Sequence, residues 1–320
     1  MFFGWFAKRY TLLVEIGNCM TYASIIQEKG RKFTLIEQVG VVTTSCKDGI
    51  IRNHSKFIGS LRELIKKLTI NSWSKVIVGF DSTHIRSHWF NNINQKSIAS
   101  ILEHINSSNE KVIFHTYHNG SLTALTMRRN MLTYLYNCFE EAGIEVHRFV
   151  PIKYYYAYYA DQIHNEYKDI LMVINLGYRS TNITVFNKGF PVSYKTTYLG
   201  VENVVLAIAD KYKISMEDAK YTIKNTAIFS ADSRQWINCG GVQINEKEIA
   251  DNLFSCYQAL IQKVLTKDIT KISHAVLIGW ATKLPEMENI FENFIPNPIH
   301  TKEPDPRIMQ PELVSLISLP

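Results

Sequence analysis

The chain repeats one pattern of expected elements in its two halves, and this repeat constrains the fold more than any other feature of its 320 residues. Short apolar runs bounded by polar turns predict three strands at the start of each half, at 11–16, 22–27, 33–42, 169–176, 182–187 and 190–197. In each half the three strands form an expected antiparallel meander that leads into helices and a further apolar strand. Such a duplication predicts an α/β protein with two similar lobes.

Helices are expected where apolar residues recur every three or four positions. The segment 55–68 shows this clearly, with Phe57, Leu61, Leu64 and Leu68 on one face. Other helices are expected at 98–105, 128–142, 153–164, 201–211, 215–224, 245–265 and 287–294. Strands are expected at 75–80, 111–117, 144–150 and 274–279. We therefore place the first lobe at residues 1–150 and the second at 151–320.

Composition limits the classes of function. The chain is 46% hydrophobic, enough for a substantial core, and no run of about 18 apolar residues predicts a membrane-spanning helix. The net charge of +6 is mildly basic, but the basic residues are dispersed. Dispersed charge is typical of a solvated surface, so nucleic acid is not an expected partner.

Three glycine-containing loops follow the ends of expected strands and contain the candidate site residues. They read Glu15-Ile16-Gly17-Asn18, Asn175-Leu176-Gly177-Tyr178-Arg179-Ser180-Thr181-Asn182 and Gly279-Trp280-Ala281-Thr282-Lys283-Leu284-Pro285. Glycine at such turns allows backbone N–H groups to approach phosphate oxygens, and nearby carboxylates hold Mg²⁺ in phosphoryl-transfer sites.

In this order, the loops resemble the two phosphate loops and the adenosine loop of the bacterial cell-division protein FtsA, a family of the actin-like ATPase superfamily. Segments between them resemble the same family, namely Gly49-Ile50-Ile51, Val78 through Ser87, Asp218-Ala219 with its following lysine, and Asp305-Pro306-Arg307. The resemblance spans almost the whole chain. It implies an actin-like (ASKHA, ribonuclease H-like) duplicated two-domain fold with an interdomain nucleotide cleft.

One departure from the FtsA pattern is a shortened segment, and a second family is also similar. FtsA carries an inserted subdomain after its H-I-x-S loop, here His84-Ile85-Arg86-Ser87. That subdomain is expected near 85–127 and is reduced here, so its partner and filament contacts need not be retained. The pilus-assembly protein PilM is a structural relative of FtsA with chains of similar length. A PilM-like protein, which binds a short peptide of a membrane partner, is therefore the alternative family.

The loops also lack acidic residues that the resemblance implies. Glu15 replaces an aspartate with a longer side chain, and Asn175 and Asn182 replace two acids with neutral amides. Tyr178 and Arg179 take two glycine positions, although the Arg179 guanidinium is able to contact phosphates. ATP is the ligand that the resemblance implies, whereas the missing acids argue against Mg²⁺ and efficient hydrolysis.

In the adenosine loop, Trp280 either stacks on a base or fills its place. The residues expected to contact a nucleotide are Glu15, Gly17, Asn18, Asn175, Gly177, Arg179, Ser180, Gly279 and Trp280. No catalytic residue and no metal ligand is assigned. Three readings stay open: nucleotide binding without turnover, a closed site, and an active ATPase that tolerates Glu15 and Asn175.

The N-terminal leader combines aromatic and basic side chains, namely Phe2, Phe3, Trp5, Phe6, Lys8 and Arg9. Aromatic rings that enter a bilayer surface, with cations at the headgroups, would anchor the chain to a membrane. Packing of the leader on the body of the protein is the alternative.

The expected function is that of a scaffold with degenerate ATP-binding loops on the cytoplasmic face of the bacterial inner membrane. The FtsA resemblance implies that it links the tubulin-like division protein FtsZ, and other divisome proteins, to that membrane, and that it self-associates. The alternatives are a PilM-like platform protein of a type IV pilus or secretion system, and an active actin-fold ATPase.

Overall fold

The computed structural model describes most of the chain, namely residues 9–17, 20–30, 32–47, 49–82, 84–152, 154–155, 157, 170–188, 190–265, 272–280, 284–295 and 299–301. The chain divides into two compact units, residues 1–159 with 305–320, and residues 160–304. Residues 151–157 thus belong to the first unit, although the second lobe was expected to begin at 151. Among the described helices, none is long and apolar enough to cross a membrane.

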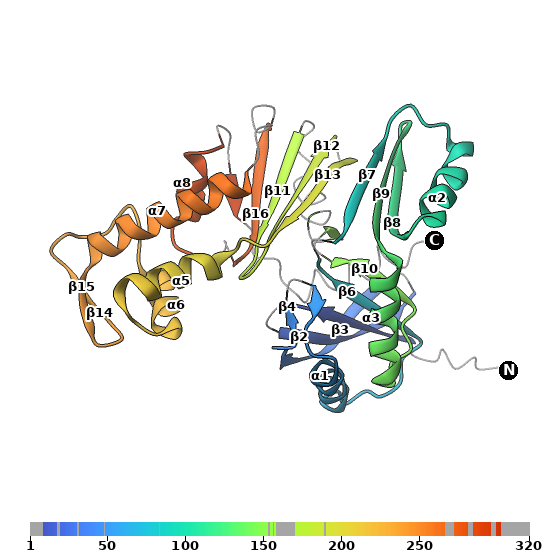
Figure 1. The fold of residues 1–320 in the computed structure, drawn as a ribbon, viewed down its shortest axis with the longest axis horizontal. Coiled ribbons are helices and arrows are strands. Elements are labelled where there is room, and N and C mark those ends of the chain that lie inside the picture. Colours follow the sequence, from blue (N-terminus) through green and yellow to red (C-terminus); the bar gives the residue numbers. More distant parts are fainter. Residues whose placement is uncertain are drawn as a thin grey trace. The chain divides into compact units, whose positions relative to one another are not determined.

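The first unit is built on a five-stranded sheet (Figure 1). Its strands, in the order β10-β6-β1-β2-β3, are β10 (Arg148–Pro151), β6 (Lys75–Phe80), β1 (Arg9–Ile16), β2 (Met20–Lys29) and β3 (Lys32–Val42). β1 pairs antiparallel with β2 and parallel with β6, so it lies inside the sheet. Leu12, Leu13 and Val14 of β1 are buried in succession, as expected for a strand covered on both faces.

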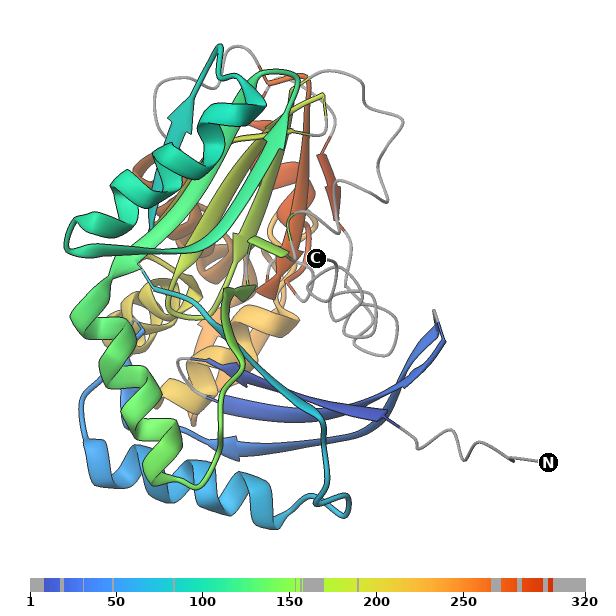
Figure 2. The same ribbon diagram turned by 90° about the vertical axis from the view of Figure 1, so that its right-hand side faces the viewer.

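Two helices, α1 (His54–Lys66) and α3 (Arg129–Glu141), contact each other and pack against this sheet; in Figure 2 the lower part of α3, in green, crosses α1, in light blue. α1 begins where the Asn53 side chain accepts a hydrogen bond from the backbone N–H of Lys56. The Phe57 ring of α1 meets Phe139 of α3 at 6.2 Å between centroids, and Phe139 meets Phe149 of β10 at 5.7 Å. These aromatic contacts join the two helices to the sheet.

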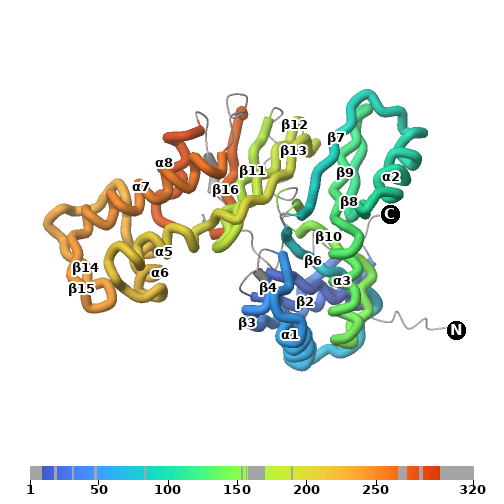
Figure 3. The backbone as a smooth tube through the Cα atoms, in the orientation of Figure 1, coloured from blue at the N-terminus to red at the C-terminus, as the bar shows by residue number. Residues whose placement is uncertain are grey.

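A second, three-stranded sheet lies in the region where a reduced inserted subdomain was expected (Figure 3). Its elements, with strand order β7-β9-β8, are β7 (Arg86–Phe90), the short 3-10 helix η1 (Gln95–Ser97), α2 (Ile98–Ser107), β8 (Glu110–His118) and β9 (Ser121–Arg128). Within it, Glu110 accepts hydrogen bonds from Thr126 (2.6 Å), Arg86 (2.8 Å) and His88 (3.0 Å). Earlier in the chain, the two-residue strands β4 (Cys46–Lys47) and β5 (Ile50–Ile51) pair antiparallel as a short hairpin.

The second unit repeats the sheet of the first. Its strands, in the order β13-β12-β11-β16-β17, are β13 (Phe190–Thr197), β12 (Thr181–Asn187), β11 (Ile170–Leu176), β16 (His274–Gly279) and β17 (Ile299–Thr301). β11 pairs antiparallel with β12 and parallel with β16, as β1 pairs with β2 and β6. The duplication predicted from the sequence is therefore confirmed at the level of strand pairing.

Helices and one hairpin complete the second unit, namely α5 (Val201–Tyr212), α6 (Met216–Asn225), β14 (Trp236–Cys239), β15 (Val242–Asn245), α7 (Glu246–Val264) and α8 (Met287–Glu292). One face of β11 and β16 forms a single core with these helices. Ser215 accepts a hydrogen bond from the N–H of Asp218, which confirms the predicted start of α6. The β14–β15 hairpin was not predicted; its turn is Gly240-Gly241, with φ of 60° and 87°.

Candidate functional site

The first glycine loop is a tight turn between β1 and β2. The Gly17 N–H donates to the Met20 carbonyl at 3.0 Å. A Cβ at Gly17 would lie 2.5 Å from that carbonyl oxygen, so only glycine fits. Glu15 lies one residue before the end of β1, partly buried, opposite Tyr22 of β2. Asn18 falls outside the described residues.

The second loop, between β11 and β12, is joined to the start of α5. The Gly177 N–H donates to the Ser180 carbonyl at 3.0 Å, which closes the turn. The first helical N–H groups of α5 donate back to it, from Val201 to the Gly177 carbonyl at 3.2 Å and from Glu202 to the Tyr178 carbonyl at 2.7 Å. Free N–H groups at a helix N-terminus commonly bind anions, and here these two are engaged by the turn.

The Arg179 side chain is held by an ion pair. Its Nε donates to Glu202 Oε1 at 2.9 Å, and the two side chains are only 26% and 21% exposed. The sequence suggested that this guanidinium contacts phosphates. In the structure its Nε is directed to a carboxylate of its own unit.

Asn182, in the position where the resemblance implies an acid, is completely buried and hydrogen-bonded on both sides of its amide. Nδ2 donates to the Lys195 carbonyl at 3.2 Å and to Thr196 Oγ1 at 3.1 Å, and Oδ1 accepts from Thr184 Oγ1 at 3.1 Å. A carboxylate has no donor for the carbonyl. The amide is therefore part of the β12–β13 pairing.

Asn175 and Gly279 meet at the ends of the parallel strands β11 and β16. Gly279 has a φ of 79°, and a Cβ there would lie 2.5 Å from Asn175 Oδ1 and 3.0 Å from the Leu176 carbonyl oxygen. The buried Asn175 side chain thus lies directly against the glycine backbone. The fit requires glycine because of both its φ and its lack of a side chain.

Trp280 contacts the second loop and helix α6. Its ring lies 5.4 Å from the Tyr178 ring, at an interplanar angle of 44°. Lys224 Nζ lies 4.7 Å from the centre of the Trp280 ring, and Lys220 Nζ lies 5.4 Å from the centre of the Tyr178 ring. Both rings pack against the core of the second unit. We call Tyr178, Trp280, Lys220 and Lys224 the aromatic lock.

Among the site residues expected from the sequence, the structure brings Asn175, Gly177, Arg179, Ser180, Gly279 and Trp280 to one end of the second unit's sheet. Three side chains that contact these residues were not assigned a role from the sequence. Glu202 pairs with Arg179, and Lys220 and Lys224 cover the aromatic rings. Two sequence signals preceded the latter pair: the resemblance of Asp218-Ala219 with its following lysine, and the spacing of the two lysines, four residues apart on one helix.

The second unit does not fit a Mg²⁺ site of the kind that the resemblance implies. Mg²⁺ prefers charged oxygen ligands, whereas Asn175 and Asn182 are neutral and the Asn182 amide is engaged by its own strands. Within the part of the chain that the structure describes, no three histidine, cysteine, aspartate or glutamate side chains are placed to hold a metal ion.

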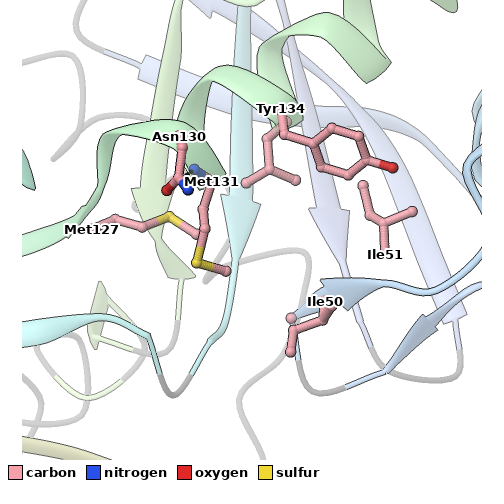
Figure 4. Close-up of a pocket in the computed structure, with 8 residues that line it drawn as sticks. Ile50, Ile51, Met127, Asn130, Met131 and Tyr134 are labelled. Atoms are coloured by element: carbon pink, nitrogen blue, oxygen red, sulfur yellow. Dashed lines mark hydrogen bonds between the residues drawn. The ribbon is translucent and has the colours of Figure 1, made fainter. Parts of the chain in front are cut away.

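A separate pocket of about 260 Å³ lies in the first unit, beside α3. It is lined mainly by apolar side chains, from Gly49, Ile50, Ile51, Met127, Asn130, Met131, Tyr134 and Leu135. Figure 4 shows the two isoleucines on one side and the methionines on the other. In the expected N-terminal leader, Phe2, Phe3, Trp5, Phe6 and Lys8 fall outside the described residues, and Arg9 is the exposed first residue of β1.

The chain is similar to known proteins in structure, but no match is found by sequence. No protein-family model matches the sequence, and no curated protein matches it. The PilM–PilN type IV pilus biogenesis complex superposes with a TM-score of 0.68 at 12% identity, over 96% of both chains. MreB5 of Spiroplasma citri bound to AMPPNP gives 0.60 at 12% identity, over 97% of this chain and 94% of that one.

The ethanolamine utilization protein EutJ from Carboxydothermus hydrogenoformans gives a TM-score of 0.56 at 17% identity, over 96% of this chain and 89% of that one. At these identities the similarity concerns the fold. FtsA, which the loop sequences resemble, is not among these structures. Together with the duplicated sheets, the comparisons show that this chain has the actin-like ATPase fold.

Proposed function

We propose that the protein is a scaffold of the PilM type, which holds a membrane partner protein at the cytoplasmic face of the bacterial inner membrane. One observation carries the proposal. The similarity to a structure of the PilM–PilN type IV pilus biogenesis complex covers 96% of both chains. Because that similarity includes nearly all of this chain, it supports a role that uses the whole fold.

The pocket in the first unit supports a docking role. Apolar side chains line most of a space of about 260 Å³, large enough for two or three apolar side chains of a partner. It lies where β9 of the three-stranded sheet continues into α3, since Met127 belongs to β9 and Met131 to α3. We propose that a short apolar segment of a PilN-like partner enters this pocket.

The test is a binding measurement with two purified candidates, the PilN-like protein and the FtsZ of the same organism, by biolayer interferometry. Met131→Glu places a charge in the pocket, and Thr133→Glu places the same charge on an exposed position of the same helix. We expect the PilN-like protein to bind the wild type and Thr133→Glu, and to bind Met131→Glu at least tenfold more weakly. Equal binding by both variants would remove the pocket from the proposal.

A division scaffold of the FtsA type is the second candidate. The order of the three loops and of the segments between them favours it, as quoted above from the sequence. In the same assay, binding of FtsZ without binding of the PilN-like protein would select this candidate. FtsZ, other divisome proteins and self-association would then be the partners to study.

ATP is the nucleotide to test, because MreB5 of Spiroplasma citri has been solved with AMPPNP and with ADP. Efficient ATP hydrolysis is not part of the proposed role. The residues that would hold Mg²⁺ in the second unit are amides, and Asn182 is engaged by strand pairing. The proposed scaffold therefore acts by binding rather than by turnover.

The N-terminal leader is proposed to assist membrane attachment. Removal of residues 2–9 should reduce co-sedimentation of the full chain with vesicles that contain anionic lipid, since aromatic rings and two cations are lost. Equal co-sedimentation of the two proteins would exclude the leader as an anchor and would leave the partner as the link to the membrane.

A further inference from the structure

We infer that the aromatic lock takes the place of a nucleotide in the second unit, so that its loops are held in position by the chain itself without ATP or Mg²⁺. The inference does not depend on which partner the scaffold binds. It disagrees with what the actin-like fold implies, and it is based on contacts of the described residues of this unit.

Tyr178 and Trp280 bring into contact two loops that a nucleotide would otherwise join. Tyr178 belongs to the turn between β11 and β12, and Trp280 directly follows β16. Their rings lie 5.4 Å apart in a tilted arrangement, within the range of favourable aromatic pairs. Both rings also pack against the helical core of the unit. The pair thus connects the loops through protein contacts alone.

Two lysine side chains cover the rings of this pair. Lys224 Nζ lies over the Trp280 ring and Lys220 Nζ over the Tyr178 ring, both within the 6 Å typical of cation–π contacts. Lys220 also donates to Glu217 at 2.6 Å, and this hydrogen bond raises the pKa of its ammonium group. The ammonium therefore stays charged over the ring at neutral pH. These two positive charges are engaged by rings of the same unit.

Several groups that would meet a phosphate already have hydrogen-bond partners in the protein. The first N–H groups of α5 donate to the carbonyls of Gly177 and Tyr178, and the Arg179 Nε donates to Glu202. The Asn182 amide is used within the sheet. Because these groups have protein partners, a phosphate bound to them would have to displace several of their hydrogen bonds at once.

An open stacking platform for a base is the competing interpretation. It would require an aromatic face that is accessible, as in proteins where bases stack on exposed rings. The Trp280 side chain is instead partly buried, and its ring packs against Tyr178, Lys224 and the core. We therefore favour a filled site.

Hydrogen–deuterium exchange of the full chain, followed by mass spectrometry, tests the inference. Exchange is compared with no addition, with ATP and Mg²⁺, and with ATP and EDTA. We expect unchanged exchange in residues 175–182 and 216–225 of the wild type under all three conditions. Slower exchange there with ATP, with or without Mg²⁺, would overturn the inference, because it would show that nucleotide still binds these loops.

The lock itself is tested by Trp280→Ala, with Trp236→Ala as the control, since Trp236 is 65% exposed in the same unit. We expect at least tenfold faster exchange of 175–182 in Trp280→Ala and no change there in Trp236→Ala. If Trp280→Ala does not fold, the milder Lys224→Ala, which removes the cation over the Trp280 ring, takes its place. In that variant we expect two- to fivefold faster exchange of residues 175–182. Wild-type exchange in the folded lock variants would contradict the assigned role. Neither result decides the proposal of a PilN-like partner, which has its own binding assay.

Discussion

Replacing Asn182 by aspartate restores the acid that the resemblance implies, and its outcome separates a structural role from a lost metal ligand. Asn182 is completely buried, and its Nδ2 donates to the Lys195 carbonyl and to Thr196 Oγ1 at 3.2 and 3.1 Å. In Asn182→Asp both donors disappear. Thr196 is able to turn its hydroxyl and donate, but the carbonyl is not. A carboxylate oxygen then faces a carbonyl oxygen inside the sheet.

The cost follows from two contributions. The Lys195 carbonyl, whose hydrogen bond to Asn182 is partly buried, loses its donor, which costs about 1–3 kcal/mol. Burial also raises the pKa of the new carboxyl group by roughly 2–3 units, which adds about 3–4 kcal/mol at pH 7. We therefore expect a loss of about 4–7 kcal/mol in the free energy of unfolding of the second unit, or roughly 10–25 °C in its melting temperature.

The assay is thermal unfolding followed by circular dichroism between pH 4 and pH 8. Because the raised pKa means that the folded variant keeps a proton that the unfolded chain loses above about pH 3.9, the deficit relative to wild type should grow as pH rises. Asn187→Asp, at the exposed end of the same strand, is the control and should remain close to wild type. A variant that is as stable as wild type and is further stabilised by Mg²⁺ would refute the reasoning.

Two further substitutions test other parts of the structure. Gly279→Ala should destabilise the second unit by about 2–4 kcal/mol, because the new Cβ has an unfavourable φ and meets a side chain at 2.5 Å. Gly241→Ala shares the positive φ but has no neighbour within 4 Å, so about 1 kcal/mol is expected, and equal losses in denaturant titrations would disprove the steric argument. Glu110→Gln should cost about 1–3 kcal/mol at pH 7. The hydrogen bond from the Thr126 hydroxyl is the largest cause that lowers the pKa of Glu110, and the hydrogen bond from His88 and the charge of Arg86 lower it further. The loss should therefore shrink as pH falls below the carboxyl's ordinary value of 4.5, and a pH-independent loss would contradict this.

Much of the architecture was predictable because it depends on local patterns. The apolar strands and their glycine turns gave the duplication, and the amphipathic spacing of Phe57, Leu61 and Leu64 gave α1. β9 was missed because six consecutive buried residues in it include threonines and an alanine, which show neither alternation nor a continuous apolar run. The strand expected at 144–150 is shorter and begins at Arg148.

The places of the site loops in the chain were predictable from the sequence. The contacts that their side chains make were not. The sequence located the loops, because glycine and chain order are visible in it. It did not reveal that Arg179 pairs with Glu202, 23 residues away, or that lysines of α6 cover Tyr178 and Trp280. Such pairings depend on how the α5 and α6 helices pack on the sheet, which no local pattern specifies. Whether these residues contact a nucleotide stays a prediction.

Phosphate release from ATP tests the central claim, that this actin-like fold acts without ATP turnover, most directly. The full chain and Glu15→Ala are each incubated with ATP and Mg²⁺, and inorganic phosphate is measured over time against a sample without protein. Glu15 is the one acidic residue retained in the three loops, so any residual turnover should depend on it. We predict that both proteins release phosphate at the rate of the protein-free sample. Steady turnover by the wild type that disappears in Glu15→Ala would contradict the account.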